Sequence, residues 1–346
     1  LQNLYAETNK AGKYPIVHYR IPGLKTSTAD LGAYSLRSNG ALFDGKIYFV
    51  AGDTLYSIDP VKTVTSIGTI GTTEGRVSII EGQTYLMLVD GDDGYTYDGT
   101  TFAAIADVDF PANQTPKLLP KHVSYKDGFF IVVCSNDANY YVSDLEDPTS
   151  WDGLRFANAE ARPDLLKALR SADDFLYLFG EYSTEAWYNA GVQNNPFVKA
   201  EGGVSTWGVD AEWSVAEAGD TIFFLGRKRD GGKEVCRTAG ASVSVISTSE
   251  ISDEINNLSQ TSDAFGFGYT QNGHEFYVLT FPIGQKTFVY DIKEGLWHTR
   301  HSKNIGRWRP NGHGYYNGVH YVGSPANGQM YELDFDTYTD AGDYIS

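Results

Sequence analysis

Short apolar segments rich in aromatic residues alternate along the chain with polar turns that contain Gly or Asp. One unit recurs: a turn, an aromatic-rich strand, a second turn, and a strand that ends in Tyr-x-x-Asp or a close variant. Its first copy covers residues 43–50 and 54–59, and its seventh ends at Asp334. The copies lie at steps of 37, 46, 46, 45, 54 and 45 residues, counted between Gly45, Gly82, Gly128, Asp174, Gly219, Gly273 and Gly318.

This period predicts the fold. A propeller blade of four antiparallel strands occupies about 40–50 residues. Each repeated hairpin also follows a short apolar strand, such as residues 77–80, 121–125 or 265–269, which we expect to be the innermost strand of its blade. The sequence therefore predicts an all-β protein, a seven-bladed β-propeller of four-stranded antiparallel blades over residues 34–340.

Several segments fall outside this regular frame. Residues 1–33 form an extended arm punctuated by proline, which either completes the last blade and closes the ring or docks on a neighbour. Residues 145–165 and 192–213 are expected to be long loops. Helical spacing of Ile251, Ile255 and Leu258 predicts a short surface helix. Residues 341–346 are a terminal segment.

Charge narrows the range of partners. The formal net charge is −17, from 27 Lys and Arg against 44 Asp and Glu. This argues against a protein that reads nucleic-acid sequence, because affinity for phosphate backbones comes from clustered cations. The negative charge permits contact with DNA that slides past an acidic wall. Equally, a net negative charge of this kind can serve only to keep a protein soluble. No run of 18 apolar residues is present, so no membrane span is expected.

The sequence predicts no catalytic residue, metal site or cofactor. Asp90–Gly94 resembles half of a calcium loop, but Gly94 and Thr101 replace the carboxylates that an EF-hand requires, which favours a turn. Among the seven histidines only His298 and His301 are closely spaced, and we interpret them as surface residues at a strand end. Cys134 and Cys236 are expected to be buried and free.

One cluster mixes aromatic and cationic residues between the sixth and seventh copies of the repeat. It is either a partner interface or a solvated loop, since Trp and Arg are the residues that most often anchor interfaces. Its members are Trp297, Arg300, Arg307, Trp308 and Arg309.

Residues 143–191 carry the most distinctive motif. It reads Ser143-Asp144-Leu145 with Pro148 and Trp151, then Phe156-Ala157-x-Ala159-Glu160-x-x-Pro163-Asp164, then Leu178-Phe179-Gly180-x-x-Ser183-Thr184-Glu185-x-Trp187-x-Asn189-x-Gly191. This motif resembles the packaged-DNA stabilisation proteins of short-tailed bacteriophages, which are tail accessory factors. A looser resemblance extends from Tyr19-x-x-Pro22-Gly23-Leu24 to Tyr331-Glu332-Leu333-Asp334, which is nearly the whole chain.

The resemblance implies a virion structural protein without enzymatic activity. Such a protein is made in the host cytoplasm and forms a ring of identical subunits, a hexamer, below the portal and adaptor. As a tail hub or nozzle, it continues the DNA channel and helps to retain packaged DNA until ejection. Its neighbours are the portal–adaptor and a tail needle or tailspike, and DNA passes without sequence-specific binding. Family members continue past the position of Ser346 with a further β-region, so we expect the chain to be part of a longer protein.

Two alternatives remain open on the residues themselves. The first is a propeller that binds carbohydrate or acts on glycosides, for which paired carboxylates would have to converge on the central channel. The second is a general interaction scaffold.

Overall fold

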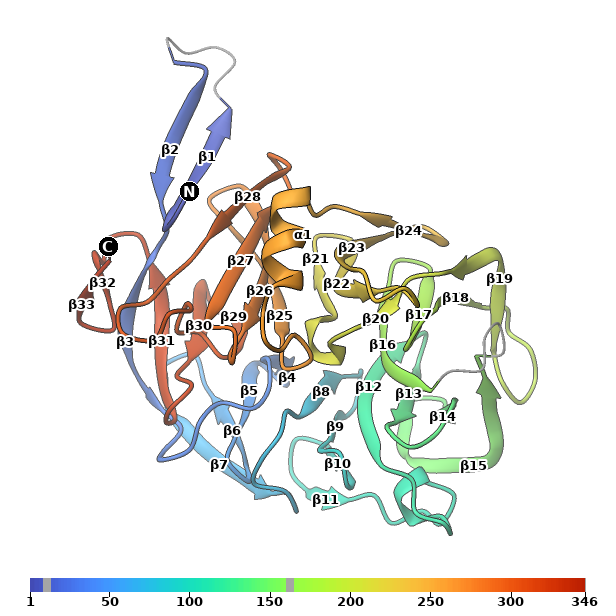
Figure 1. Ribbon diagram of the computed structural model, residues 1–346. Coiled ribbons are helices and arrows are strands. Elements are labelled where there is room, and N and C mark those ends of the chain that lie inside the picture. Colours follow the sequence, from blue (N-terminus) through green and yellow to red (C-terminus); the bar gives the residue numbers. More distant parts are fainter. Residues whose placement is uncertain (9–13, 160–164, 346) are drawn as a thin grey trace.

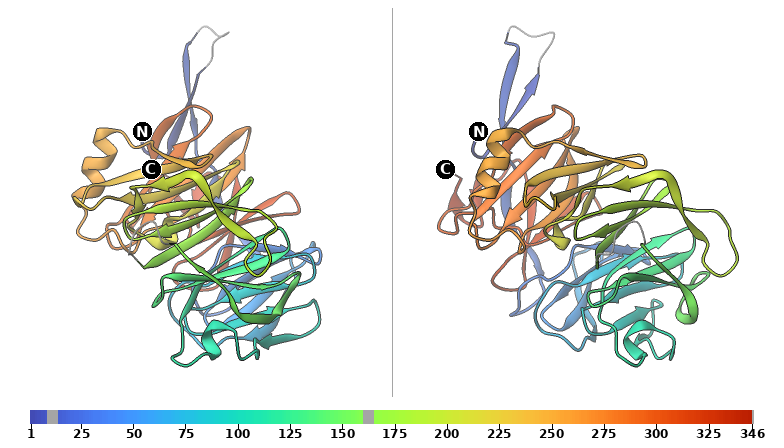
Figure 2. Two further views of the ribbon diagram at one scale, coloured as in Figure 1. Left: turned by 90° about the vertical axis from the view of Figure 1, so that its right-hand side faces the viewer. Right: turned by 45° about the vertical axis from the view of Figure 1, so that its right-hand side comes forward.

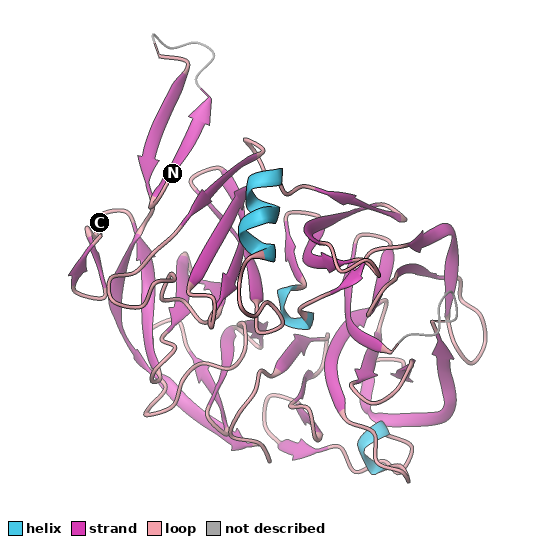
Figure 3. Cartoon of the chain, viewed as in Figure 1, coloured by secondary structure: helices cyan, strands magenta, loops and turns pink. Residues whose placement is uncertain are grey.

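A computed structural model describes residues 1–8, 14–159 and 165–345 of the chain. Seven antiparallel sheets surround a common centre, and β4, β8, β12, β16, β21, β25 and β29 are the strands nearest to it (Figure 1). Nearly all of the regular structure in the described residues is strand (Figure 3). The predicted seven-bladed propeller of four-stranded antiparallel blades is confirmed.

The first four blades follow one another along the chain without exchange of strands. Blade one contains β4 (Ala41–Phe43), β5 (Lys46–Ala51), β6 (Thr54–Ile58) and β7 (Val64–Thr69). Blade two contains β8 (Ser78–Glu81), β9 (Leu86–Val89), β10 (Gly94–Tyr97) and β11 (Phe102–Ala104). Blade three contains β12 (Pro120–Lys126), β13 (Phe129–Cys134), β14 (Asn139–Asp144) and β15 (Asp147–Asn158). Blade four contains β16 (Leu166–Ala172), β17 (Phe175–Gly180), β18 (Thr184–Asn189) and β19 (Phe197–Ser205).

Blades five and six carry the irregular insertions. Blade five contains β20 (Gly208–Val209), β21 (Ala216–Ala218), β22 (Thr221–Arg227), β23 (Lys233–Ala239) and β24 (Ser242–Val245). Blade six contains β25 (Phe265–Gln271), β26 (His274–Phe281), β27 (Lys286–Asp291) and β28 (Leu296–Thr299). The predicted surface helix is present between these blades as α1 (Ser249–Asn256), and Thr248 caps its first turn. Single-turn 3₁₀ helices occur at η1 (Pro111–Asn113) and η2 (Glu212–Ser214).

Blade seven joins the two ends of the chain. It contains β29 (His313–Tyr316), β30 (Val319–Gly323) and β31 (Gln329–Asp334), and its outer strand is β3 (Gly23–Asp30) from the N-terminal segment. The register places Leu24 opposite Leu333 and Thr26 opposite Tyr331. Two short strands, β32 (Thr339–Asp340) and β33 (Asp343–Tyr344), extend this sheet beyond β3. The N-terminal segment therefore closes the ring.

The turns explain why the repeat is visible in the sequence. The first hairpin turns at Asp44 and Gly45, whose φ angles of 44° and 66° lie in the left-handed region. Two-residue turns of this kind require positive φ and favour Asp-Gly or Asn-Gly. The apolar strands that flank each turn are buried between neighbouring blades; the rings of Phe179 and Phe224, for example, meet at 4.9 Å between blades four and five.

Two predicted loops are strands in the structure. Residues 145–165 were expected to form a loop, yet β15 occupies 147–158, and β19 occupies 197–205 within the other predicted loop. Both are the outermost strands of their blades, where proline and glycine are tolerated because one edge has no hydrogen-bonded neighbour. Pro148 and Gly153 in β15 therefore do not prevent strand formation.

A two-stranded hairpin lies outside the seven blades and contacts blade six through β1. It consists of β1 (Leu4–Thr8) and β2 (Ile16–Arg20), which pair antiparallel with Leu4 opposite Arg20. The hairpin projects away from the propeller body in every view (Figures 1 and 2).

Candidate functional site

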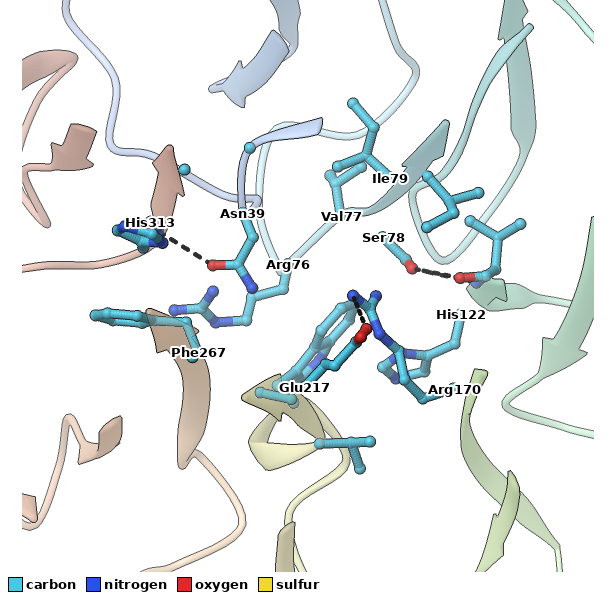
Figure 4. Close-up of a pocket in the computed structure, with 18 of the residues that line it drawn as sticks. Asn39, Arg76, Val77, Ser78, Ile79, His122, Arg170, Glu217, Phe267 and His313 are labelled. Carbon is cyan, nitrogen blue, oxygen red and sulfur yellow. Dashed lines mark hydrogen bonds and ion pairs between the residues drawn. The ribbon is translucent and has the colours of Figure 1, made fainter. Parts of the chain in front are cut away.

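The innermost strands enclose a cavity of about 300 Å³ at the centre of the ring (Figure 4). Residues from all seven blades line it, among them Leu42, Glu81, His122, Leu169, Glu217, Phe267 and Tyr315. Arg76 and Trp213 line both this cavity and a second one of about 430 Å³ beside it. These two side chains therefore lie between two compartments of one channel.

The channel walls carry both signs of charge, in contrast to the acidic chain as a whole. On the wall of the central cavity, Arg170 lies 3.7 Å from the carboxylate of Glu217. Restricted solvation within the channel raises the pKa of Glu81, whose side chain still contacts solvent. Glu81 and Glu217 are thus two carboxylates that face one cavity in different electrostatic surroundings.

His122 and Trp213 form an uncharged part of the wall. Their ring centroids are 4.2 Å apart. Burial, reinforced by Lys121 and Arg170, lowers the pKa of His122 to about 3, so the ring is neutral at physiological pH. Its Nε2 atom has no hydrogen-bond partner in the described part of the chain.

The size of the channel limits what can enter it. A cavity of about 300 Å³ is at the lower end of the range for small-molecule sites. A cavity of this volume suits a small molecule and is far too small for a turn of duplex DNA, whose major groove alone is about 12 Å wide.

The hairpin is the other prominent feature of the surface. Leu4, Ile16 and Tyr19 are exposed on it, with Ile16 at 53%. Tyr5, by contrast, is buried at its base, where its ring contacts those of Tyr19, His274 and Phe276 at 5.0–5.7 Å.

Backbone and charged contacts fix this base to blade six. The amide of Asn3 donates to the carbonyl of Thr299, and the amide of Thr299 donates to that of Leu1. Glu7 pairs with Lys293 at 3.1 Å. The amide of Thr8, at the far end of β1, donates to Glu294 at 3.0 Å, so β1 is attached to blade six along its described length.

In the structure, the residues of the predicted interface cluster contact other residues of the same chain. Trp308 and Arg300 are each 1% exposed, and the Arg300 guanidinium lies over the rings of Trp308, Tyr269 and Phe276 at 4.6–5.4 Å. Tyr5 belongs to the same buried cluster as Trp308. Two of the five residues thus pack beneath the hairpin, within this chain.

The remaining three members also make contacts within the chain. Arg307 is buried and donates to the carbonyl of Trp308, and Arg309 donates to Asp340 at 3.2 Å. The indole of Trp297 donates to the carbonyl of Ile246 at 3.1 Å. Trp297 and Arg309 are only partly buried, and a role for them at an interface stays a prediction.

His298 corrects another expectation. It was interpreted as a surface residue, but it is 3% exposed and accepts a hydrogen bond from Nε of Arg300. The reason is the N-terminal hairpin: Tyr5 lies 6.3 Å from the His298 ring and helps to cover it. Because Tyr5 and His298 are far apart in the sequence, the residues around His298 do not indicate that Tyr5 covers it.

The distinctive 143–191 motif stabilises blades three and four. The hydroxyl of Ser143 accepts from the amide of Phe130 at 3.0 Å, and Trp151 packs edge-on against Phe110. The indole of Trp187 donates to Glu185 in the core of blade four. Glu160, Pro163 and Asp164 of the motif lie outside the described residues.

The acidic segment at 90–94 is a turn. One carboxylate oxygen of Asp90 accepts from the amides of Asp92 and Asp93 at 3.0 and 2.7 Å. Across the described ranges no group of three His, Cys, Asp or Glu side chains is arranged to hold a metal ion. Within the same ranges, no helix has the length and apolar character needed to cross a membrane.

Comparison with solved structures identifies the fold but not the function. Virginiamycin B lyase from Staphylococcus aureus aligns with a TM-score of 0.61 at 8% identity, covering 90% of this chain and 98% of that one. The N-terminal domain of Nup159 aligns with a TM-score of 0.53 at 10% identity, covering 96% of this chain and 98% of that one. The Pan2 WD40 domain of Neurospora crassa aligns with a TM-score of 0.54 at 8% identity, covering 90% of this chain and 94% of that one.

At the level of sequence, no curated protein matches the chain. A family model does match, over residues 1–338, and its description is Phage_stabilise: Bacteriophage P22 Gp10, beta-propeller. The match covers almost the whole chain and confirms the family inferred from the 143–191 motif. Its description supports a structural role in a bacteriophage. The chain therefore belongs to the Phage_stabilise family, the β-propeller of bacteriophage P22 Gp10.

Proposed function

We propose that this protein is a non-enzymatic structural component of the phage tail, assembled as a ring of identical subunits below the portal–adaptor. The ring continues the DNA channel as a hub or nozzle and helps to retain the packaged genome until ejection. The observation that carries this proposal is the family match along residues 1–338.

The geometry supports a ring in which DNA passes between subunits. The cavity at the centre of one propeller has a volume of only about 300 Å³, so the conduit would be the space enclosed by several copies. A net charge of −17 per subunit disfavours adhesion of the phosphate backbone. DNA then moves past without being bound in a sequence-specific manner.

The proposal places three kinds of partner around the ring. The portal–adaptor binds one end, a tail needle or tailspike is adjacent to the other, and neighbouring copies bind laterally. Six copies are expected from the family resemblance. Closure of the propeller by β3 supports this role, because it makes each subunit a continuous ring of blades without an open end.

Assembly with the connector tests the proposal. Purified protein is mixed with the portal–adaptor complex, and the products are measured by light scattering and imaged by electron microscopy. We expect a stable complex with a ring of this chain on the adaptor. A strict monomer that ignores the portal–adaptor complex would refute the proposal.

A second candidate function rests on the channel carboxylates. Glu81 and Glu217 line one cavity, and the raised pKa of Glu81 beside an Arg-paired Glu217 resembles the division between acid and base in glycoside hydrolysis. A glycan array and a hydrolase screen test this function. Binding or turnover that Glu217→Gln abolishes would favour it, and no signal in either assay would exclude it.

A further inference from the structure

We propose that the central cavity of the propeller binds a small molecule with one carboxylate group, and that the guanidinium of Arg76 holds this carboxylate. The inference concerns a single subunit and goes beyond the proposed role in the phage tail. It does not depend on a ring of subunits, so either proposal can fail while the other stands.

Arg76 carries a positive charge that the chain does not pair. It lines the central cavity of about 300 Å³ and also the second one of about 430 Å³. Its Nη2 atom donates to the carbonyl of Asn311 at 2.9 Å, and the guanidinium makes no other hydrogen bond within the described ranges. No carboxylate of those ranges lies within 4.0 Å of its nitrogen atoms. Since a guanidinium presents five N–H donors, most of them are left for a ligand.

A second cation increases the need for an anion beside Arg76. Burial and the nearby guanidinium of Arg307 lower the pKa of Arg76 to about 9, so the group keeps its charge at neutral pH. Both guanidinium groups lie over the ring of Phe265, at 3.7 and 5.8 Å from its centroid. Burying a charge is costly unless the charge is paired. An anion in contact with Arg76 would offset this cost.

The position of Asp263 favours the central cavity over the second one. Asp263 lines the second cavity, and its carboxylate offsets part of the charge of Arg307. An anion in the second cavity would therefore be repelled by a carboxylate that is already there. On the side of the central cavity, Arg76 meets no carboxylate within 4.0 Å in the described part of the chain.

The two carboxylates of the central cavity are associated with a different arginine. Arg170 lies 3.7 Å from Glu217 and attracts the charge of Glu81 as well. Figure 4 shows Arg170 and Glu217 on one side of the cavity and Arg76 on the other, toward Phe267. Burial raises the pKa of Glu81, which favours its neutral form. The charge of Arg76 is thus the one left to be matched.

This balance of charge selects the class of anion. A carboxylate has one negative charge and two oxygens that a guanidinium can contact with two parallel hydrogen bonds. Phosphate offers similar oxygens but carries more charge at neutral pH. The surplus charge would be repelled by Glu81 and Glu217 in the same cavity. We therefore assign the site to a monocarboxylate.

The wall near Arg76 supplies a polar donor and apolar surface. The side-chain oxygen of Asn39 accepts from the backbone amide of His313 at 3.2 Å, which leaves the Nδ2 atom of Asn39 as a donor at the cavity (Figure 4). The aromatic rings of Trp213 and Phe267 also line this cavity. Such a combination suits a ligand that has a carboxylate at one end and a compact aromatic or aliphatic body.

Calorimetric titration of the purified chain with benzoate tests the assignment. Benzamide has nearly the same shape without the charge, and inorganic phosphate has more charge without the apolar body. We expect benzoate to bind one site with a Kd of about 1 mM or tighter. Benzamide and phosphate should each bind at least tenfold more weakly. Absence of benzoate binding, or equal binding of benzamide or phosphate, would overturn the assignment.

Two variants locate the site. Arg76→Gln should weaken benzoate binding at least tenfold, whereas Arg229→Gln, which removes the same charge from an exposed loop, should leave it within twofold of wild type. Circular dichroism establishes that each variant is folded. Should Arg76→Gln fail to fold, Arg76→Lys takes its place and should still bind benzoate more tightly than benzamide. Full benzoate affinity in folded Arg76→Gln, or equal losses in the Arg76→Gln and Arg229→Gln variants, would show that Arg76 does not hold the ligand.

Discussion

Arg37 illustrates how one buried side chain can organise a whole loop. Its guanidinium donates to the carbonyls of Gly52, Thr72, Glu74 and Gly75, and to the hydroxyl of Thr72. Arginine suits this task because its planar group presents five donors in a fixed arrangement. The residue thereby holds the connection between blades one and two against the mouth of the central channel.

Replacing this arginine should be costly. Arg37→Ala is expected to lower the free energy of unfolding by about 3 kcal/mol or more, because several backbone carbonyls lose a charged donor. Urea unfolding followed by tryptophan fluorescence measures the change. Lys286→Ala is the control, since its exposed ion pair with Glu254 should contribute less than about 1 kcal/mol. Equal losses in the two variants would contradict the prediction.

His313 and His320 form a buried neutral pair. His313 Nε2 lies 3.0 Å from His320 Nδ1. Burial lowers the pKa of His313 to about 3, with a further contribution from His320, and burial lowers that of His320 to about 4. Unfolded histidines titrate near pH 6.5. Between pH 6.5 and about 4 the unfolded chain therefore binds more protons than the folded one, and stability is lost as the pH falls.

This linkage predicts a measurable pH slope. From pH 6.5 to 5 the pair should account for roughly 2–3 kcal/mol of lost stability. The double variant His313→Gln/His320→Gln should lose most of that slope in urea unfolding. His18→Gln, at an exposed position on the hairpin, should keep it. Retention of the full wild-type slope in the double variant would show that the pair is not responsible.

At the scale of elements, Tyr5 is the buried apolar anchor of the hairpin, beside the polar contacts of Asn3 and Glu7. Tyr5 is 4% exposed among residues of blades six and seven, whereas Ile16 farther along the hairpin is exposed. Tyr5→Ala should therefore release the base of the hairpin without unfolding the blades. Limited proteolysis should cut within residues 1–20 at least several-fold faster, with the propeller core intact. Ile16→Ala is the control, and equal cleavage of the two variants would contradict this account.

The sequence predicts those elements whose signals are local. The blades were predictable because each hairpin has its own turn residues, such as Asp44 and Gly45, and its own alternating strands. β15 was missed because Asp147-Pro148 and Asp152-Gly153 are typical of loops, and only the position at a blade edge makes them compatible with a strand. The exposed edge of β15 is a property of the assembled sheet.

Three members of the predicted interface cluster, Arg300, Arg307 and Trp308, are buried for a related reason. Trp308 and Arg300 have the composition of interface anchors, but Tyr5 and blade six cover them within the same chain. The residues that make these contacts are about 300 positions apart in the sequence, as in the hydrogen bond from Asn3 to His301. A long-range contact of this kind leaves no local pattern in the sequence.

At the scale of the whole molecule, charge and channel size act together. The chain carries a net charge of −17, and its central cavity is about 300 Å³. The isolated protein should therefore bind short DNA duplexes of any sequence only weakly, with a Kd above about 10⁻⁴ M at physiological salt. Fluorescence anisotropy with two unrelated duplexes measures this. A sequence preference, or micromolar affinity, would contradict the passive role toward DNA that we propose for the ring.

Closure of blade seven by β3 has a consequence for folding of the chain during its synthesis. Ser27 on β3 donates to Glu332 on β31, a partner 305 residues later in the chain. At ribosomal rates of about 5–20 residues per second, β3 waits roughly 15–60 s for that partner. Blades six and seven, which hold the base of the hairpin, are also the last to be made. A nascent chain that ends before blade seven can thus neither close its propeller nor bury the base of its hairpin.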